Sequence, residues 1–328
     1  MSDYAPPFHL TEEIAELGIE IGELLGEISV SNALSADPRL RRETRIRSIY
    51  SSLAIEQNTL SLDQVKDVIN GKPVLGPPKD IREVQNAYEV YERMSSFDPT
   101  SMDDLLTAHR IMISDLVKEA GRFRSGNVGV FREGQLIHAG TPAAYVPEVM
   151  AQLFEWLRDS RFPPLLKSCI FHYEFEFIHP FADGNGRTGR FWQTLILQKW
   201  KPVFAWLPVE SMIHGRQEAY YTALNEANSR NDCAVFVAFM LTAIRDTIRD
   251  AIAAARQHVG ENVGENVGEK EREIIEIIAL SPSISAKNIA QKMGMTSRQV
   301  ERLLSQLKAK RLIERVGPDK GGHWKVNK

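Results

Sequence analysis

Residues 179–190 read HPFADGNGRTGR and form the most informative stretch of the chain. Its glycines have the G-x-G-x-x-G spacing of dinucleotide-binding loops. The preceding residues 171–177 alternate aromatic with polar side chains, which is typical of a strand. However, a helix through residues 166–177 fits the same run, Pro180 interrupts the strand, and no βαβ units surround it. A dinucleotide-binding sheet is therefore not favoured.

The residues around these glycines favour an anion site. Residues 184–186, Gly-Asn-Gly, precede a helix expected over residues 187–200. The first N–H groups of a helix have no intrahelical acceptor, and together with the helix dipole they attract anions. Arg187 and Arg190 are three residues apart, so they are neighbours on the first turn and can hold further phosphate oxygens.

Two more side chains complete this chemistry. Asp183 offers an oxygen ligand beside a phosphate site, where Mg²⁺ is the expected ion. His179 has the side chain whose ordinary pKa suits proton transfer near pH 7. A zinc site of His172, His179 and Asp183 is conceivable, but its spacing matches no usual zinc motif. The stretch therefore indicates phosphoryl-group chemistry.

HPFADGNGRTGR resembles the signature of the Fic-domain family, H-x-F-x-[D/E]-G-N-G-R-x-x-R, at every defined position. The resemblance implies an all-α fold, a helical bundle with a β-hairpin flap beside the site, in which residues 171–178 are helical. It also implies transfer of AMP from ATP to a Tyr, Ser or Thr hydroxyl of a target protein, or of the enzyme itself, with release of pyrophosphate.

The resemblance assigns a role to each matching residue. His179 is the general base, Phe181 anchors the loop, and Asp183 holds Mg²⁺ on the ATP phosphates. The residues expected to bind the ATP phosphates are Gly184, Asn185, Gly186, Arg187, Gly189 and Arg190.

Two further segments resemble parts of the family. GRFR at residues 121–124 looks like the segment leading into the flap, so residues 125–138 are expected to form the hairpin that pairs with target backbone. An ordinary surface hairpin is the alternative. YYTALNEAN at residues 220–228 resembles the adenine-side helix, with Tyr221, Leu224 and Asn228 on one face. Without the signature, that face would be interpreted as core packing.

SLAIEQN at residues 52–58 resembles the inhibitory-helix pattern [S/T]-x-x-x-E-[G/N], with Ser52 and Glu56 in place. Gln57 departs from the pattern, and Asn58 is expected to supply the helix cap one residue later. The resemblance implies that Glu56 pairs with Arg190 and blocks the γ-phosphate. A solvated glutamate on a helix face is the alternative.

The charge of the chain is unevenly distributed. The 328 residues carry a net charge of −3, yet residues 283–328 contain 11 Lys plus Arg against 3 Asp plus Glu. This basic segment is expected to meet a polyanion. Before it, VGENVGENVGE at residues 259–269 repeats with a period of four, and the glycine density indicates a flexible linker over 257–269.

The segment 270–328 resembles a winged helix-turn-helix. A helix ending before Pro282, a helix over 285–293, a Gly294 turn, a helix over 297–312 and strands at 312–316 and 323–326 give this order. In such domains the third helix enters the major groove, so DNA contacts are expected from Thr296, Ser297, Arg298, Gln299 and Arg302, with Lys320 and Lys325 on the wing. A protein-interaction module is the alternative.

The division expected for the chain is an N-terminal helical region over 1–110, with the inhibitory helix near 45–58, a catalytic core over 111–256, the linker and the winged segment. Helical spacing predicts body helices over residues 12–29, 39–56, 62–69, 81–94, 102–116, 146–159 and 234–255. His109, His172 and His214 are expected to be packed or solvated.

Composition narrows the class of protein. A 43% hydrophobic and 25% charged chain with two cysteines is neither disordered nor a disulfide scaffold. The sequence has no apolar run of membrane-spanning length and no signal-peptide pattern, so a cytoplasmic protein without membrane contact is expected. Two alternative functions remain open: removal of AMP from a modified protein by the same site, and DNA-binding regulation with a nucleotide-sensing body.

Overall fold

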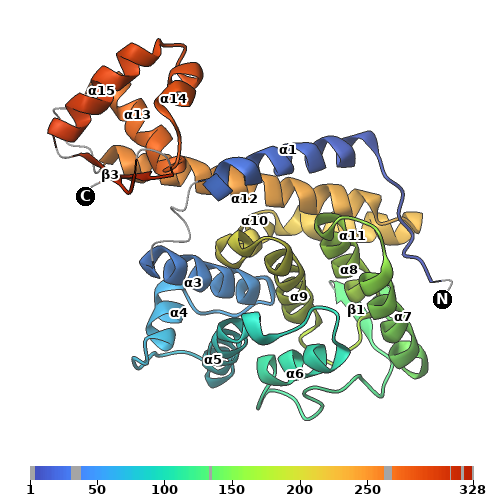
Figure 1. Cartoon of the computed structure of the whole chain (residues 1–328). Helices are drawn as coiled ribbons and strands as arrows, with labels where there is room; N and C mark the ends of the chain where they lie inside the picture. Colours follow the sequence, from blue (N-terminus) through green and yellow to red (C-terminus); the bar gives the residue numbers. More distant parts are fainter. Residues whose placement is uncertain are drawn as a thin grey trace. The chain divides into compact units, whose positions relative to one another are not determined.

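The computed structural model describes residues 4–30, 38–132, 135–261, 268–310, 312–318 and 321–326. The chain forms two compact units (Figure 1). The first unit combines Met1–Ile19 with Arg42–Thr247, and the second combines Glu20–Arg41 with Ile248–Lys328. All residues of the 179–190 motif belong to the first unit.

The body of the chain is helical, which confirms the all-α prediction. None of its described helices is both long and apolar enough to cross a membrane. The helices are α1 (Glu12–Val30), α3 (Pro38–Ile55), α4 (Leu62–Ile69), α5 (Pro78–Glu92), η1 (Met94–Ser96), α6 (Met102–Met112), η2 (Ala143–Tyr145), α7 (Val146–Asp159), α8 (Pro164–Ile178), α9 (Asn185–Trp200), η3 (Pro202–Trp206), α10 (Val209–Gly215), α11 (Gln217–Arg230) and α12 (Ala234–Glu261).

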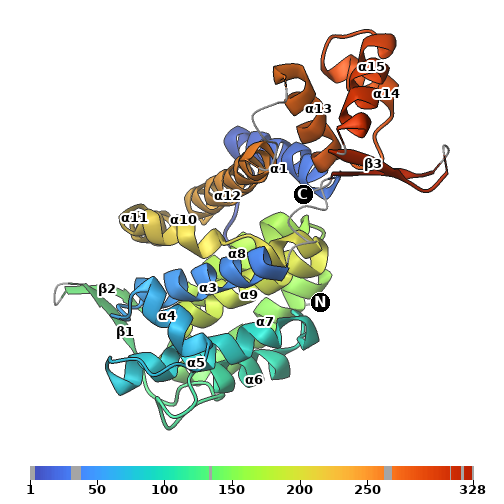
Figure 2. The ribbon, with the colours of Figure 1, turned by 90° about the vertical axis from the view of Figure 1, so that its left-hand side faces the viewer.

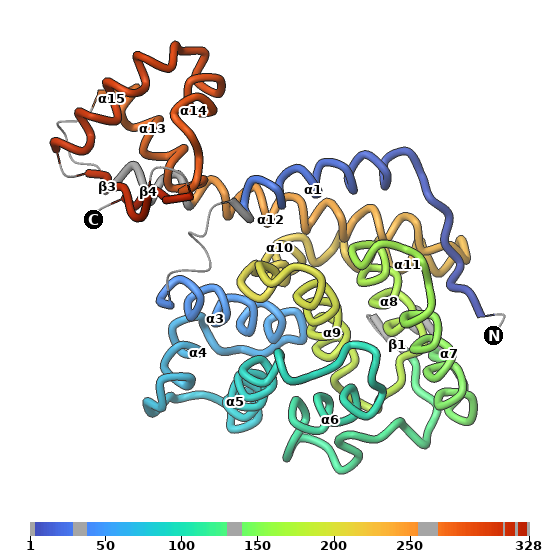
Figure 3. The backbone as a smooth tube through the Cα atoms, viewed as in Figure 1, coloured from blue at the N-terminus to red at the C-terminus, as the bar shows by residue number. Residues whose placement is uncertain are grey.

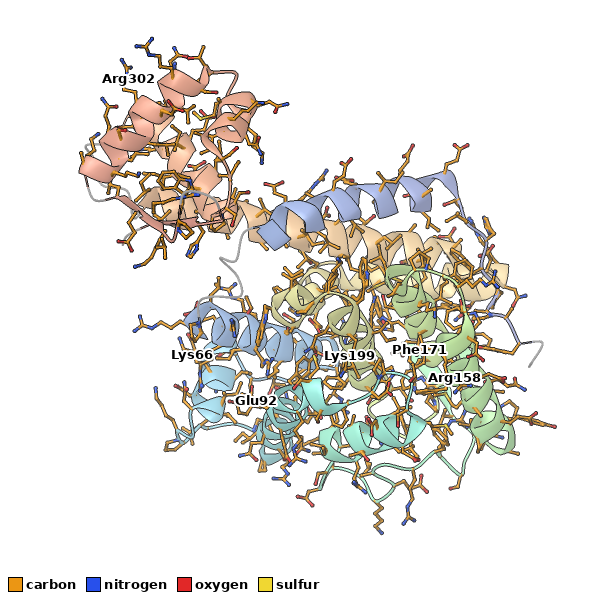
Figure 4. All side chains as sticks on the ribbon, in the orientation of Figure 1. Lys66, Glu92, Arg158, Phe171, Lys199 and Arg302 are labelled. Atoms are coloured by element: carbon orange, nitrogen blue, oxygen red, sulfur yellow. The ribbon has the colours of Figure 1, made fainter. Side chains whose placement is uncertain are left out.

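One hydrophobic core runs through α3 to α9 of the first unit. It contains Ile46 and Leu53 of α3, Leu105 of α6, and Phe171 and Trp192 of α8 and α9. Figure 4 labels Phe171 inside this bundle, and Figure 3 traces the backbone around it. Side chains from both sides of residue 110, where a boundary is expected, pack together in this core.

Helix α8 occupies the residues whose alternation resembled a strand, and its helical state confirms the expectation drawn from the family resemblance. Pro164 begins it, a position that suits a residue without an N–H group. Ten consecutive residues from 166 to 175 include nine buried ones. A helix buried on nearly all sides has no polar face, so hydrophobic periodicity cannot distinguish it from a strand.

The predicted hairpin is formed by β1 (Gly129–Arg132) and β2 (Gln135–Ala139) (Figure 2). The strands are antiparallel, with Gly129 opposite Ala139, and the register shifts between Val130 and Phe131. The strands therefore begin four residues after the start of the expected segment 125–138 and end one residue after its end.

The second unit contains α13 (Glu269–Leu280), α14 (Ala286–Lys292), α15 (Ser297–Ala309), β3 (Ile313–Val316) and β4 (His323–Val326), in the order predicted. These elements share their own core, which includes Ile275, Ile289, Leu304 and Trp324. Gly294 makes the predicted turn with φ +62°.

The expected linker over 257–269 is shorter than predicted. Helix α12 continues to Glu261 instead of ending at residue 255, and α13 begins at Glu269. Residues 262–267 of the expected linker lie outside the described residues. The helix continues across Val259 and Gly260, although a glycine inside a helix costs about 1 kcal/mol.

Candidate functional site

The motif folds into a compact turn between α8 and α9. His179 ends α8 in the left-handed conformation, with φ 53° and ψ 62°, and its N–H donates to the carbonyl of Phe175 at 3.0 Å. Gly184 precedes α9, also left-handed, with φ 82°. An added Cβ at Gly184 would lie 2.3 Å from Ile113 Cδ1, so glycine is required there by both conformation and space.

The side chain of Asn185 holds this turn closed. Its Oδ1 accepts from the N–H of Phe181 at 2.8 Å, and its Nδ2 donates to the carbonyl of Phe181 at 2.8 Å. Asn185 is 2% exposed, so its amide faces the loop and not a ligand. The expectation that Asn185 binds phosphate therefore applies to its backbone N–H only.

His109 supports the same loop, and sequence reasoning assigned it no role beyond packing. Its ring stacks on Phe181 with centroids 3.6 Å apart. The N–H of Gly121 donates to Nδ1 at 2.9 Å, so Nε2 carries the proton that it donates to the carbonyl of Asp183 at 3.0 Å. Burial lowers the pKa of His109 to about 4, which keeps this neutral tautomer. The contact spans 74 residues of sequence and leaves no local signal.

The N-terminus of α9 faces the carboxylate of Glu56. The first intrahelical bond of α9 runs from the N–H of Thr188 to the carbonyl of Gly184 at 3.0 Å, so the amides of residues 185–187 precede it. A Cβ added to Gly186 would lie 2.2 Å from Glu56 Oε1. Glycine at this position therefore lets an anion approach the helix start, and here that anion is a carboxylate.

Arg190 is bound by Ser52, which lies in α3, and by Glu56, which directly follows α3. Its Nη2 donates to Glu56 Oε1 at 2.8 Å and to the carbonyl of Ser52 at 2.9 Å, and its Nε donates to Ser52 Oγ at 3.1 Å. The side chain of Arg190 is 1% exposed. Burial alone would lower its pKa, but the Glu56 carboxylate raises it, so the guanidinium stays charged. The structure thus brings together the three residues of the expected inhibitory contact.

A second acid, Glu176, lies behind Arg190. Burial raises the pKa of Glu176 to about 8, against an opposing effect of Arg190, and the nearby Glu56 raises it further. This raised pKa favours the protonated form of Glu176 at neutral pH. Its neighbour His172 is fully buried against Gln193 and Tyr220, with a pKa lowered by burial to about 3, so this histidine is packed as expected.

Arg187 is held by two carboxylates. Its Nη1 contacts Glu83 Oε1 at 3.0 Å, and its Nη2 contacts Asp183 Oδ1 at 2.8 Å. The side chains of Arg187 and Glu83 are 4% and 6% exposed. The other oxygen of Glu83 accepts from Asn58 Nδ2 at 2.8 Å. Sequence reasoning missed Glu83, because nothing local marks a glutamate whose partner lies 104 residues away.

Asp183 fits a role as a magnesium ligand. Its side chain is 41% exposed, and its Oδ1 accepts from the N–H of Gly184 at 2.6 Å. Mg²⁺ commonly takes one or two carboxylates and completes its shell with phosphate and water oxygens, so a single carboxylate beside an anion site is sufficient. Within the described part of the chain, no group of three His, Cys, Asp or Glu side chains could hold a metal, so the conceivable zinc site is absent.

Gly189 does not belong to the anion site, contrary to prediction. A Cβ added there would lie 2.7 Å from Glu176 Oε1 and 3.1 Å from Phe175 Cδ1, both on α8. Gly189 therefore allows α8 and α9 to pack closely. Gly189 is also the third glycine of the G-x-G-x-x-G spacing. In this structure a glycine is needed there because α8 packs closely against α9.

The end of α3 differs from the expectation at Asn58. Gln57, and not Asn58, takes the left-handed conformation, with φ 66°. The N–H of Asn58 donates to the carbonyl of Leu53 at 3.1 Å, and the N–H of Gln57 donates to that of Ala54 at 3.0 Å. This pair of bonds is the Schellman motif, and it leaves Glu56 as the C-cap residue.

The residues expected on the adenine side lie on α11, whose Gln217 donates to the carbonyl of Ile55 at 3.0 Å. Tyr221 is close enough to Glu56 for that carboxylate to raise its pKa, after the larger effect of burial. Asn228, two turns along, accepts from the hydroxyl of Tyr173 at 3.0 Å. Leu224 is half-buried between them. The structure thus places Tyr221 at the site and engages Asn228 with α8.

The expected DNA contacts lie on α15 of the second unit. Arg298 and Arg302 are exposed, and Figure 4 shows Arg302 directed away from that unit. Gln299 is engaged in the helix cap, because its Oε1 accepts from the N–H of Thr296 at 3.0 Å. Lys325 pairs with Glu314 at 2.6 Å, and Lys320 lies outside the described residues.

Comparison with known proteins connects this geometry to a family. The model of the Fic/DOC family matches residues 99–197. A crystal structure of a Fic family protein from Desulfovibrio desulfuricans G20 superposes with a TM-score of 0.75 at 46% identity, covering 99% of this chain and 98% of that one. The chain belongs to the Fic family. The superposition extends over both units of the chain, whereas the family model covers residues of the first unit only.

Curated relatives of this Fic protein carry an activity in their names. Protein adenylyltransferase fic-1 of Caenorhabditis elegans is 33% identical over 219 residues, which cover 62% of this chain and 40% of that protein. Protein adenylyltransferase Fic of Nematostella vectensis is 30% identical over 215 residues, 62% of this chain and 47% of that protein. The Fic chain described here thus spans less than half the length of these relatives.

Proposed function

We propose that the protein is an adenylyltransferase that moves AMP from ATP to a Tyr, Ser or Thr hydroxyl of a target protein or of itself. The observation that carries the proposal is the anion site at the start of α9, where Gly186 admits a carboxylate oxygen and Arg190 binds it. The names of the relatives support AMP as the transferred group.

The proposed reaction gives each part of the motif a role. His179 accepts the proton of the target hydroxyl, whose oxygen attacks the α-phosphorus of ATP while pyrophosphate leaves. The amides of residues 185–187 and Arg190 would bind the phosphates and stabilise the charge of the leaving group. Asp183 would hold Mg²⁺, which supplies further charge neutralisation when bound.

Glu56 is proposed to inhibit this reaction. Its carboxylate occupies the position against Gly186 and Arg190 that a phosphate would need. A charge-assisted hydrogen bond contributes about 1.5–3 kcal/mol, and a carboxylate that is 33% exposed is partly screened. A contact of about 1–2 kcal/mol lowers the population of the open site by about 5–30-fold.

The test is incubation of the full chain with labelled ATP and Mg²⁺, followed by intact-mass analysis. Glu56→Gly is expected to gain about 5–30-fold in AMP transfer over wild type, and adding His179→Ala should abolish it. Glu43→Gly, an exposed position on the same helix, serves as the matched control. If Glu56→Gly transfers no more AMP than wild type, and His179→Ala changes nothing, the proposal is wrong.

Removal of AMP from a modified protein is a second candidate for the same site. The observation that favours it is the position of the Glu56 carboxylate at the anion site, where it could orient a water molecule as well as block a phosphate. Release of AMP from an adenylylated partner by wild type, and its loss in Glu56→Gly, would support removal. Gain of transfer in the same variant would support the first proposal.

DNA binding is proposed for the second unit, as a winged helix-turn-helix. The exposed Arg298 and Arg302 on α15 support it. The full chain should bind duplex DNA with an affinity that falls as salt rises, and Arg298→Ala with Arg302→Ala should weaken binding and reduce the salt dependence. Binding that is indifferent to both substitutions would favour a protein partner.

A further inference from the structure

Arg124 is a buried arginine without a role in the proposed chemistry. It lies in the segment between α6 and the hairpin and is 3% exposed. Among the residues that the structure describes, none of the ion pairs includes Arg124, so its charge is balanced by backbone oxygens. A guanidinium kept in such an environment must be bound closely by carbonyl groups, because an unpaired buried charge is costly.

One group of these carbonyls lies at the C-terminal end of helix α8. Nε of Arg124 donates to the carbonyl of His179 at 2.7 Å, and Nη2 donates to that of Ile178 at 3.3 Å. The backbone N–H of Arg124 donates to the carbonyl of Pro180 at 3.0 Å. The last carbonyls of a helix lack intrahelical donors and carry the negative end of the helix dipole, so a cation is favoured there.

The other group of carbonyls lies on both sides of the hairpin. Nη1 of Arg124 donates to the carbonyl of Gly126, before β1, at 2.9 Å, and Nη2 donates to that of Thr141, after β2. A Cβ added to Gly140 would lie 3.2 Å from Nη2 of Arg124 and 3.4 Å from Cβ of His179. The chain leaving the hairpin thus passes directly against His179.

The backbone of His179 depends on such support. With φ 53° it occupies the left-handed region, which costs an ordinary residue about 1–2 kcal/mol. A strained conformation of this kind persists only where its surroundings hold it. Nε of Arg124 donates the hydrogen bond that holds the carbonyl of His179 in place. A lysine could not replace it, because one ammonium cannot present a planar set of donors to four carbonyls.

We propose that Arg124 is a positioning residue that fixes the backbone of His179 and ties the hairpin to it. A target backbone paired with the hairpin then presents its hydroxyl in a fixed register to the imidazole. The inference rests on the proposed function for the roles of His179 and the hairpin, while the linkage itself is a property of the folded chain.

The first test compares Arg124→Lys with the parent in the Glu56→Gly background, using Arg122→Lys, an exposed arginine in the same segment, as control. The expected result is a kcat for AMP transfer lowered about 100-fold by loss of alignment. The KM for ATP should stay within about twofold, because the phosphate-binding residues lie on α9. Unchanged kcat, or an equal rise in KM, would overturn the proposal.

The second test does not depend on activity. Amide hydrogen exchange is measured without nucleotide in Arg124→Lys, Arg122→Lys and wild type. Relative to wild type, amide exchange at residues 126–129 and at residues 178–181 should be faster in Arg124→Lys, and in Arg122→Lys it should be unchanged at both segments. Acceleration in one segment alone, or in neither, would refute the linkage. If the linkage holds and Glu56→Gly transfers no AMP, the proposed function fails and the inference about Arg124 stands.

Discussion

Substitution of Gln57 should set the strength of inhibition. Gln57 is exposed and takes the left-handed conformation at φ 66°, directly after Glu56. This conformation costs an ordinary residue about 1–2 kcal/mol and costs glycine nothing sterically. Glycine loses about 0.4–1 kcal/mol more backbone freedom when it becomes ordered. The net gain from Gln57→Gly is therefore about 0.5–1 kcal/mol in the state where the Schellman motif is formed.

That state is the one in which Glu56 reaches Arg190, so the gain should favour inhibition. An equilibrium shift of 0.5–1 kcal/mol corresponds to about 2–5-fold, by which basal AMP transfer of Gln57→Gly should fall below wild type. Gln57→Asn should fall less, because asparagine tolerates the left-handed region better than glutamine. Gln57→Val should rise above wild type, because a β-branched residue is strongly disfavoured there.

The assay is the initial rate of AMP incorporation at fixed ATP and Mg²⁺ for the three variants and wild type. The same substitutions in the Glu56→Gly background are the control, and there the rates should be equal. An order of rates other than Gly, Asn, Gln, Val from lowest to highest would refute the reasoning. Persistence of that order without Glu56 would show that position 57 acts by another route.

Three further outcomes are expected. Gly189→Ala should lower the free energy of unfolding by about 1–3 kcal/mol, because the added Cβ would lie 2.7 Å from a side-chain oxygen of α8. Gly18→Ala is the control: an added Cβ there would have nothing within 4 Å, so this substitution should stabilise its helix by up to about 1 kcal/mol. Equal shifts in Tm for the two variants would contradict this prediction. In the Glu56→Gly background, Asn185→Ala should slow AMP transfer about 10–100-fold, because the two hydrogen bonds that close the turn are lost. An unchanged rate would show that the turn keeps its shape without these two bonds. Burial raises the pKa of Glu174 to about 7, although the hydrogen bond from Tyr4 opposes this shift. The folded state therefore keeps a proton that the unfolded state releases near pH 4.5. As a result, the free energy of unfolding falls as the pH rises from 4.5 through 7. Glu174→Gln should therefore raise Tm at pH 8 and change it little below pH 4.5, and an effect of the same size at both would exclude this titration.

The sequence was sufficient for the features that depend on neighbouring residues. The helices over 62–69 and 146–159 have the predicted bounds, because capping signals and apolar spacing act within one or two turns. The left-handed turn at Gly184 lies within the motif as well. These are local requirements, and a short pattern contains them.

The features that the sequence did not reveal depend on contacts between distant segments. Glu83 and His109 hold Arg187 and the Asp183 carbonyl across 104 and 74 residues, and neither glutamate nor histidine on a helix indicates its partner. Gly189 was misassigned for a related reason, since its spacing is the same whether a glycine admits a phosphate or a neighbouring helix. Only the packing of α8 on α9 distinguishes the two.

The two arginines of the motif differ in the carboxylates that surround them. Arg187 keeps two carboxylate partners, Glu83 and Asp183, whereas the raised pKa of Glu176, beside Arg190, favours its protonated form near neutral pH. Within the described residues, Glu56 is the carboxylate that forms an ion pair with Arg190, at 2.8 Å. Its withdrawal would leave a buried guanidinium without a counter-charge, a state that an anion must relieve. In the proposed inhibition a nucleotide phosphate and Glu56 compete for this one charge, so each is expected to weaken the binding of the other by the same factor.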